Sequence, residues 1–387
     1  MSGSVPSATR IVAVDLARML ALLGMFAAHL LTPLDPTWPG GVDPVFQLVA
    51  GRSSALFAVL AGVSIALTTR AFREDPARHR LRLVVRAVVV AVLGLVLGLL
   101  GSGVAVILTF YGVLFLCALP FLSWGPRPLA LLALVWGLVS PVVSLVLREQ
   151  LDGPAYVVPS IVSLAEPGLL LRELLVTGYY PVLTWATYLF AGMAIGRLDL
   201  RARVWGPRLA LGGAWLAALA VAVSAWVTRP GVARSRLVET LSSPATPWAD
   251  VARELRTGLH GTHPTGSWWW LGVWSPHSGS IVDLAHTTGT AMLVLGLALV
   301  VVRAVRSAPW TLAAGAGTMT LTLYATHVVV LASAFGARGG LALVVHSAAA
   351  VAVGALFAAG GARGPLESGV TAATRLVPVR ARHVPSD

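Results

Sequence analysis

Charged side chains, cysteine and lysine are scarce or missing in this sequence. Only 11% of its 387 residues are charged, whereas 57% are hydrophobic, and the mean hydropathy is +0.81. This composition excludes a soluble globular protein and indicates a membrane protein. The single cysteine, Cys117, excludes an intrachain disulfide. Because no residue is lysine, all 28 basic residues are arginines, and the formal net charge is +12.

The signatures of several protein classes are also missing. The arginines stand in short links between apolar runs rather than on one polar domain, so we expect no nucleic-acid partner. The chain has no Walker loop, dinucleotide-binding glycine pattern, nucleophile elbow or metalloprotease motif. His260 and His263 have the spacing of metal ligands. They lie in a loop without a nearby cysteine or carboxylate, and we therefore expect no metal.

Apolar runs long enough to cross a bilayer dominate the chain. A crossing of roughly 30 Å needs about 20 apolar residues. This length predicts an all-α fold, a polytopic membrane bundle of about ten transmembrane helices (ten or eleven) in a single domain, 1–387. The predicted spans are 11–31, 45–69, 83–101, 104–122, 129–147, 179–196, 209–227, 282–302, 311–333 and 341–360. Because the first run contains Asp15 and Arg18, we expect no cleavable signal peptide.

The arginines are distributed unevenly between the two sides of this bundle. If the N-terminus is cytoplasmic, the inner links and tails hold 18 arginines, the outer links hold 8, and Arg18 and Arg52 lie within spans. The positive-inside rule then places both termini in the cytoplasm of a multi-pass plasma-membrane protein, with a cytoplasmic tail at about 361–387. The long outer segment 228–281 contains five tryptophans and three histidines. Segments of this length are usually functional, and so many tryptophans argue against disorder.

Several ionisable residues lie at depths where hydrocarbon is expected. Such groups cost several kcal/mol unless they are paired or face a wet cavity, so each is a candidate functional residue. At 1.5 Å per helical residue, four separate spans place one group of them in the outer third of the membrane. This outer group is His29, Arg52, Asp283, His286 and His327. Near the inner side, Asp15 and Arg18 have the spacing of a pair on one helix face.

Four runs resemble those of a known family. Two lie in the first two spans, Val14-Asp15-Leu16-Ala17-Arg18 and Gly51-Arg52-Ser53-Ser54-Ala55-Leu56-Phe57. Two lie near the end, Leu321-Thr322-Leu323-Tyr324-Ala325-Thr326-His327 and Arg363-Gly364-Pro365-Leu366-Glu367. Together they resemble the transmembrane acyltransferases related to heparan-α-glucosaminide N-acetyltransferase, including YeiB-like bacterial membrane proteins. Met19 departs from the family pattern, which has glycine there. The middle of the chain, about 100–270, shows the family only in its hydropathy.

The resemblance implies a membrane acyltransferase. Such an enzyme would move an acyl group, above all acetyl, from cytoplasmic acyl-CoA to an amine or hydroxyl of an extracytoplasmic glycan or glycolipid of the cell envelope. A neutral histidine could remove the acceptor's proton or carry the acetyl group itself. The catalytic candidates are His29, His327, His286 and Asp283. Guanidinium groups suit the phosphates of acetyl-CoA, and the candidates for binding it are Arg18, Arg52, Arg70, Arg73 and Asp15. A homodimer is compatible with the sequence.

Other interpretations of the same residues stay open. The intramembrane charges could serve a transporter or permease for a small anionic or amphipathic solute, although the two halves show no internal repeat. A non-catalytic membrane subunit could present the tryptophan-rich segment to a partner. Asp15 and Arg18 could form only a structural pair, and the arginines from Arg70 to Arg86 could reflect only orientation. His327 could bond to a neighbouring carbonyl, and Trp268–Trp270 could form an interfacial belt.

Overall fold

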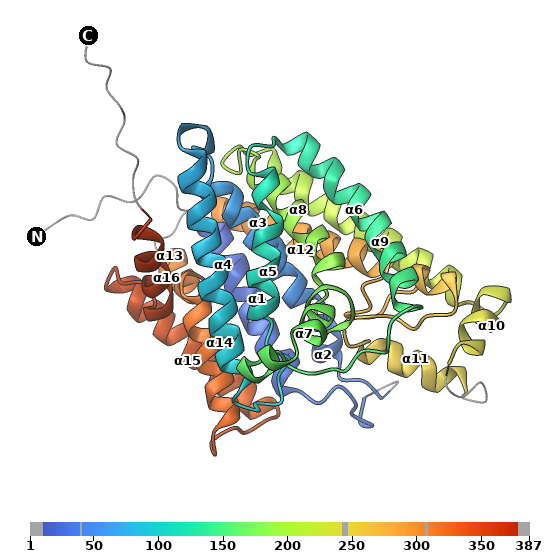
Figure 1. Ribbon diagram of the computed structural model, residues 1–387. Coiled ribbons are helices and arrows are strands. Elements are labelled where there is room, and N and C mark those ends of the chain that lie inside the picture. Colours follow the sequence, from blue (N-terminus) through green and yellow to red (C-terminus); the bar gives the residue numbers. More distant parts are fainter. Residues whose placement is uncertain (1–10, 39–40, 242–246, 306–308, 378–387) are drawn as a thin grey trace, which may run out of the picture.

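The computed structural model describes residues 11–38, 41–241, 247–305 and 309–377 (Figure 1). Within these ranges the protein is helical and contains no strand, apart from an isolated bridge between Leu34 and Val42. This arrangement confirms the predicted all-α polytopic bundle. α1 runs through the middle of the bundle, with α15 and α16 on one side and α9, α10 and α11 on the other (Figure 1).

In the part of the chain that the structure describes, seven helices are long and apolar enough to cross a membrane. Each coincides with one of the predicted spans. They are α1 (Val12–Leu30), α2 and α3 taken together (Pro44–Val49 and Arg52–Thr68), α4 (Pro76–Gly98), α6 (Pro126–Arg148), α9 (Trp205–Thr228), α12 (Ile281–Ala304) and α15 (Gly340–Ala359).

The other three predicted spans are shorter or broken. α5 (Leu108–Cys117) continues into η2 (Leu119–Phe121), whereas residues 104–107, which we expected to be helical, are not. α8 (Val182–Gly196) starts three residues later than the predicted span, directly after Pro181. The predicted span 311–333 divides into α13 (Pro309–Ala313), η6 (Ala314–Thr318) and α14 (Thr320–Ala332), with a bend of 62°.

Glycine explains why the chain breaks between α13 and α14. A Cβ atom at Gly317 would collide with the backbone of Asp15 in α1, and one at Gly315 would collide with the backbone of Gly354 in α15. The segment around η6 therefore forms a short 3₁₀ turn instead of continuing as an α-helix, which glycine disfavours. This turn packs closely against two neighbouring helices. The break brings the start of α14 against the inner half of α1.

The remaining elements lie at the two ends of the bundle. At the end that holds the start of α1, here called the inner end, lie η1 (Phe72–Glu74) and α16 (Pro365–Arg375). At the opposite, outer end, η3 (Ile161–Ala165), α7 (Pro167–Arg172) and η4 (Glu173–Thr177) connect α6 to α8. The outer segment before α12 contains α10 (Val232–Glu239), α11 (Trp248–Thr257) and η5 (Trp268–Gly272).

The outer segment has a small hydrophobic core of its own. Trp270 is almost completely buried in it, next to Leu237 and Val251, and its Nε1–H donates to the hydroxyl of Thr240 at 2.9 Å. Trp268 is 59% exposed and is not part of this core. The tryptophans therefore differ in role: one stabilises the fold of the segment, whereas another presents its ring at the surface.

Candidate active site between two cavities

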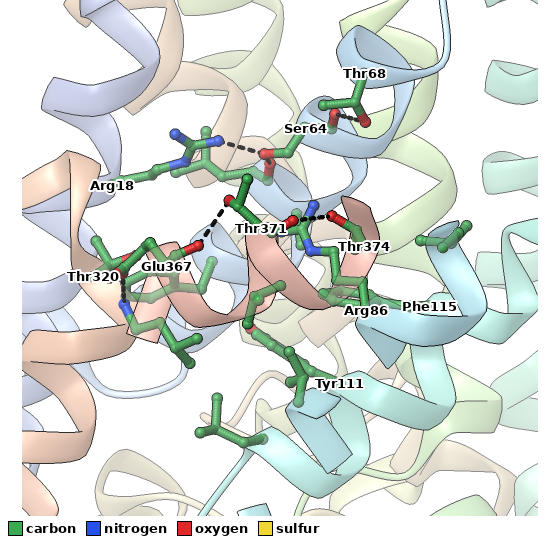
Figure 2. A pocket seen from close by; sticks show the side chains of 18 of the residues that line it. Arg18, Ser64, Thr68, Arg86, Tyr111, Phe115, Thr320, Glu367, Thr371 and Thr374 are labelled. Atoms are coloured by element: carbon green, nitrogen blue, oxygen red, sulfur yellow. Dashed lines mark hydrogen bonds between the residues drawn. The ribbon is translucent and has the colours of Figure 1, made fainter. Parts of the chain in front are cut away.

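A cavity of 560 Å³ extends from the inner end towards the middle of the bundle (Figure 2). α1, α3, α4, α5, α14 and α16 all contribute to its wall. Its basic residues are Arg18, His79, Arg82, Arg86 and Arg375. Its deeper walls are aromatic or apolar and include Met25, Phe57, Tyr111, Phe115 and Tyr324. Met25 lies about 10 Å further along α1 than Arg18, because seven helical residues separate them. The cavity thus combines a cationic entrance with a largely apolar interior.

Two of the arginines in this inner cavity are held in different ways. Arg18 is fixed by Asp15, whose Oδ1 lies 3.0 Å from Nη1, and by the hydroxyl of Ser64, 2.5 Å from Nη2. The predicted pairing of Asp15 with Arg18 is therefore confirmed. The guanidinium of Arg86 lies over the ring of Phe115, 5.2 Å from its centroid. Within the described ranges it has no hydrogen bond or ion pair, so it remains available to an anion in the cavity.

Among the described residues that line the inner cavity, the one carboxylate is already engaged. Glu367 on α16 accepts hydrogen bonds from the backbone N–H groups of Leu321 and Thr322, at 2.7 and 3.2 Å, and from the hydroxyl of Thr322 at 2.5 Å. These donors belong to the first turn of α14, whose N–H groups have no partner within the helix. Glu367 therefore caps α14 and does not neutralise the arginines. The Gly-Pro-Leu-Glu run has a structural role in this contact.

Three of the predicted ligands of the donor lie elsewhere. Arg52 lies at the outer end, where its Nη1 donates to the carbonyls of Gln47 and Leu48, and its guanidinium lies 5.1 Å from the ring centroid of Trp274. Arg70 and Arg73 are exposed at the inner end, and neither lines the inner cavity. Of the five predicted residues, only Arg18 lines this cavity, and Asp15 takes part through its ion pair with Arg18.

Three histidines from three helices form a row near the outer end. Nδ1 of His29 on α1 lies 3.2 Å from Nε2 of His327 on α14. Nδ1 of His327 lies 2.9 Å from Nδ1 of His346 on α15. Phe26 stacks on His327 with ring centroids 4.2 Å apart. Sequence reasoning identified His29 and His327 but missed His346, although an imidazole within an apolar span is itself the signal that should have found it.

Asp283 and His286 form a second polar group on α12. Oδ2 of Asp283 accepts from the backbone N–H of Gly279 at 3.0 Å, and His286 lies against Trp274 with ring centroids 5.0 Å apart. Oδ1 of Asp283 and Nδ1 of His286 are buried and have no hydrogen-bond partner among the described residues. No contact among the described residues joins Asp283 and His286 to the row of histidines. The four predicted catalytic residues therefore form two groups rather than one.

His277, just before α12, packs against residues at the start of α8. Its ring stacks on Trp185 and meets Tyr180 edge-on, and its backbone φ of 59° lies in the left-handed region. Burial, together with the charge of nearby His260, lowers the pKa of His277 to about 4. His277 is also close enough to His29 to act on it electrostatically. His277 therefore connects His29 with the outer segment.

A second cavity of 530 Å³ lies at the outer end. It is lined by the link that follows α1, by residues between α6 and α8, and by the outer segment. Asp152, Tyr156, Glu254 and His260 give this outer pocket carboxylate, aromatic and imidazole groups. Arg148 also lines it but is tied to the carbonyl of His263 at 2.5 Å. The pocket thus offers mixed polar groups rather than a uniform positive surface.

His29 lines neither cavity but lies near residues of both. Its ring centroid lies 6.4 Å from that of Tyr324, which lines the inner cavity. On its other side, Pro33 and Leu34 follow along the same chain and line the outer pocket. Within the described ranges, no group of three or more histidine, cysteine, aspartate or glutamate side chains is arranged to hold a metal ion.

The membrane helices, buried charges and two cavities define a polytopic membrane protein with an internal polar site. Residues 10–227 match the family model described as the catalytic domain of heparan-alpha-glucosaminide N-acetyltransferase. The match covers more than half of the chain, which therefore belongs to this family of membrane acetyltransferase-like enzymes. The resemblance of the first two spans is confirmed, whereas the runs around His327 and Glu367 lie beyond the matched range. No curated protein matches the chain.

Proposed function

We propose that this protein transfers an acetyl group from cytoplasmic acetyl-CoA to an amine or hydroxyl of a glycan or glycolipid on the other side of the membrane. The observation that carries this proposal is the pair of cavities, a cationic inner one and a polar outer one, with His29 near residues of both although it lines neither. Neither cavity alone would suggest a transfer reaction. Two cavities towards opposite ends of the bundle, with one imidazole near both, would give each substrate its own route towards the same group.

The inner cavity suits acetyl-CoA as the donor. Coenzyme A carries several phosphate charges, and guanidinium groups bind phosphate oxygens with two parallel hydrogen bonds. Arg18, Arg82, Arg86 and Arg375 would hold these phosphates, while Glu367 is already occupied. The apolar wall beyond them would accommodate the pantetheine arm and direct the thioester towards Tyr324 and His29. This assignment moves the donor site away from Arg70 and Arg73.

The outer pocket suits a carbohydrate acceptor. Tyr156 offers an aromatic surface for a sugar ring, and Asp152, Glu254 and His260 offer hydrogen-bonding groups for its substituents. The matched family takes its name from an α-glucosaminide acceptor. An α-glucosaminide is therefore the first acceptor to test.

The chemistry requires one proton acceptor at the junction of the cavities. In direct transfer, His29 takes the proton of the attacking amine or hydroxyl as the new bond to the acetyl carbon forms. The C–S bond then breaks, and the thiolate of coenzyme A receives the proton. In covalent transfer, His29 would first carry the acetyl group itself. Labelled acetyl-CoA, mixed with protein in the absence of acceptor and then quenched, separates these routes because only covalent transfer leaves label on the protein.

The central test is thiol release from acetyl-CoA by purified protein. We expect release that is stimulated by methyl α-glucosaminide, with acetyl appearing on the sugar. A transporter would bind or move acetyl-CoA without releasing thiol, and that outcome would overturn the proposal. A non-catalytic subunit would likewise release none.

The proposed direction of transfer depends on the orientation of the bundle. The excess of arginine at the inner end predicts that this end is cytoplasmic. In Cys117→Ala protein, a cysteine at exposed Ser235 in α10 should react with an impermeant maleimide in intact cells, whereas a cysteine at exposed Ala77 at the start of α4 should not. Labelling only at position 77 would reverse the orientation and assign acetyl-CoA to the opposite side.

A further inference from the structure

The row of three histidines continues beyond His29, away from both cavities. His327 is 2% exposed, and His346 on α15 is only half-buried. The ring centroids of His29 and His327 are 5.3 Å apart, and those of His327 and His346 are 4.9 Å apart. Three imidazoles at these distances form one connected series, in which His327 contacts a neighbour through each of its ring nitrogens.

The hydrogen-bonding capacity of imidazole restricts how this row can be protonated. A neutral imidazole has one N–H donor and one lone pair. His327 must therefore donate to one neighbour and accept from the other. If His29 donates from Nδ1 to His327, and His327 donates from Nδ1 to His346, the Nε2 lone pair of His29 is free. This arrangement prepares His29 to act as a base.

The charges around the row favour moving a proton away from His29. Arg338, in the link between α14 and α15, donates to the carbonyl of His29 at 2.5 Å and to that of Ser102 at 3.1 Å. A fixed positive charge beside His29 opposes the formation of an imidazolium there. The other titratable groups near His29 are Tyr324 on α14 and His277 in the outer segment. Arg338 contacts His29, and His346 is two rings further along the row.

We propose that His327 and His346 form a proton relay for His29, an inference that rests on the transfer reaction proposed above. When Nε2 of His29 takes the acceptor's proton, the Nδ1 proton of His29 passes to Nε2 of His327. The Nδ1 proton of His327 then passes to Nδ1 of His346, which holds the positive charge. When the thiolate of coenzyme A leaves, the Nε2 proton of His29 passes to the sulfur, and the two shifts along the row reverse. The acceptor's proton is thus balanced by the proton on the released thiol, and all three rings return to their starting state.

Two substitutions at His346 separate proton transfer from hydrogen bonding. Asparagine places an amide near the position of Nδ1 and can keep the contact with His327, but it cannot take up a proton. Alanine removes both. Ser347→Ala on the same helix is the control. Thiol release from acetyl-CoA, with methyl α-glucosaminide as acceptor, would be measured for each variant across pH, together with the affinity for acetyl-CoA.

We expect His346→Asn and His346→Ala to slow thiol release by about tenfold, less than the 10²–10⁴-fold typical of a lost general base, with unchanged affinity for acetyl-CoA. The acidic limb of the pH–rate profile should move to lower pH, because His29 alone, beside Arg338, accepts a proton less readily than the full row. A wild-type rate and profile in His346→Asn would overturn the relay, since hydrogen bonding alone would then suffice.

A second measurement does not require turnover. In protein labelled with ¹⁵N-histidine, His346→Ala should shift the ring nitrogen signals of His29, because the row sets which nitrogen of each ring carries its proton. Unchanged His29 signals would overturn the relay even in an inactive preparation. Absence of thiol release from the wild type, with the His29 signals shifted, would instead contradict the proposed transfer reaction and leave the connected row established.

Discussion

The inner cavity is lined by arginines, which keep their charge at every physiological pH, whereas the polar groups near the outer end are mainly histidines and carboxylates, which can gain or lose a proton. Arg86 has no anionic partner in the described structure, and Glu367 is engaged by α14. At the outer end, Asp283 and His286 each have one buried polar atom without a hydrogen-bond partner among the described residues. This difference matches the proposed function, in which one end would hold an anionic donor and the other would exchange protons.

The largest expected effect tests the outer half of this comparison. His29→Ala should bind acetyl-CoA normally but slow acetyl transfer by about 10²–10⁴-fold, the usual cost of losing a general base. His29→Asn should lose as much, because an amide near Nδ1 can contact His327 but cannot act as a base at Nε2. Both are measured by thiol release and by titration with acetyl-CoA. A well-folded His29→Ala protein with near-normal transfer would remove His29 from the mechanism, and His286 would be tested next.

The second prediction tests the inner half. Arg82→Gln combined with Arg86→Gln should weaken acetyl-CoA binding by at least about tenfold for each arginine, because a hydrogen bond to a charged group contributes about 1.5–3 kcal/mol. The dependence of acetyl-CoA binding on salt concentration should also decrease. The matched control is Arg70→Gln with Arg73→Gln, two exposed arginines of the same region that do not line the cavity. Equal losses in the two double variants would show that overall charge, and not the cavity, determines binding.

The smallest effect concerns stability of the outer end. His263 is 2% exposed, and burial together with Arg148 lowers its pKa to about 3 against the ordinary 6.5. Below pH 6.5, His263 binds a proton in the unfolded chain but not in the folded protein. The free energy of unfolding therefore decreases as pH falls from 6.5 towards 3. The loss should reach about 2 kcal/mol at pH 5. It can be followed by proteolysis of the outer segment between pH 7 and 5.

The control for this pH effect is His263→Asn. Nδ1 of His263 contacts the carbonyl of Pro264 at 2.8 Å, and asparagine can keep a donor near that position without titrating. The variant should therefore be less sensitive to acid than the wild type. An identical pH dependence would assign the effect to other groups.

The sequence was sufficient to predict the membrane bundle because hydrocarbon requires long apolar helices, and that requirement acts locally along the chain. It also identified the Asp15–Arg18 pair, whose spacing lies within one helix. The breaks near Ile107, Pro181 and Gly317 were missed, because they depend on which backbone segments approach one another.

The candidate site was predictable only in part, for a related reason. His29 and His327 stood out as polar residues in apolar spans, but their contact joins α1 to α14 and is not encoded in either segment alone. Likewise, Arg82 and Arg86 could not be distinguished from Arg70 and Arg73, since all four belong to one basic link and helix start. Only the packing of α4 against α5 and α16 separates the arginines that face the cavity from those that face solvent. His79, in the first turn of α4, also lines the cavity.

The engagement of Glu367 has a consequence for how the proposed donor would compete with other anions. Because α14 engages this carboxylate and Asp15 pairs with Arg18, no carboxylate among the described residues that line the cavity is left for Arg82, Arg86 and Arg375. Chloride and inorganic phosphate from the surrounding water would then bind in the cavity when acetyl-CoA is absent. Acetyl-CoA would have to displace them, so its apparent affinity should depend on which anions are present as well as on ionic strength. Phosphate, which matches the guanidinium geometry, should compete more strongly than chloride at equal ionic strength.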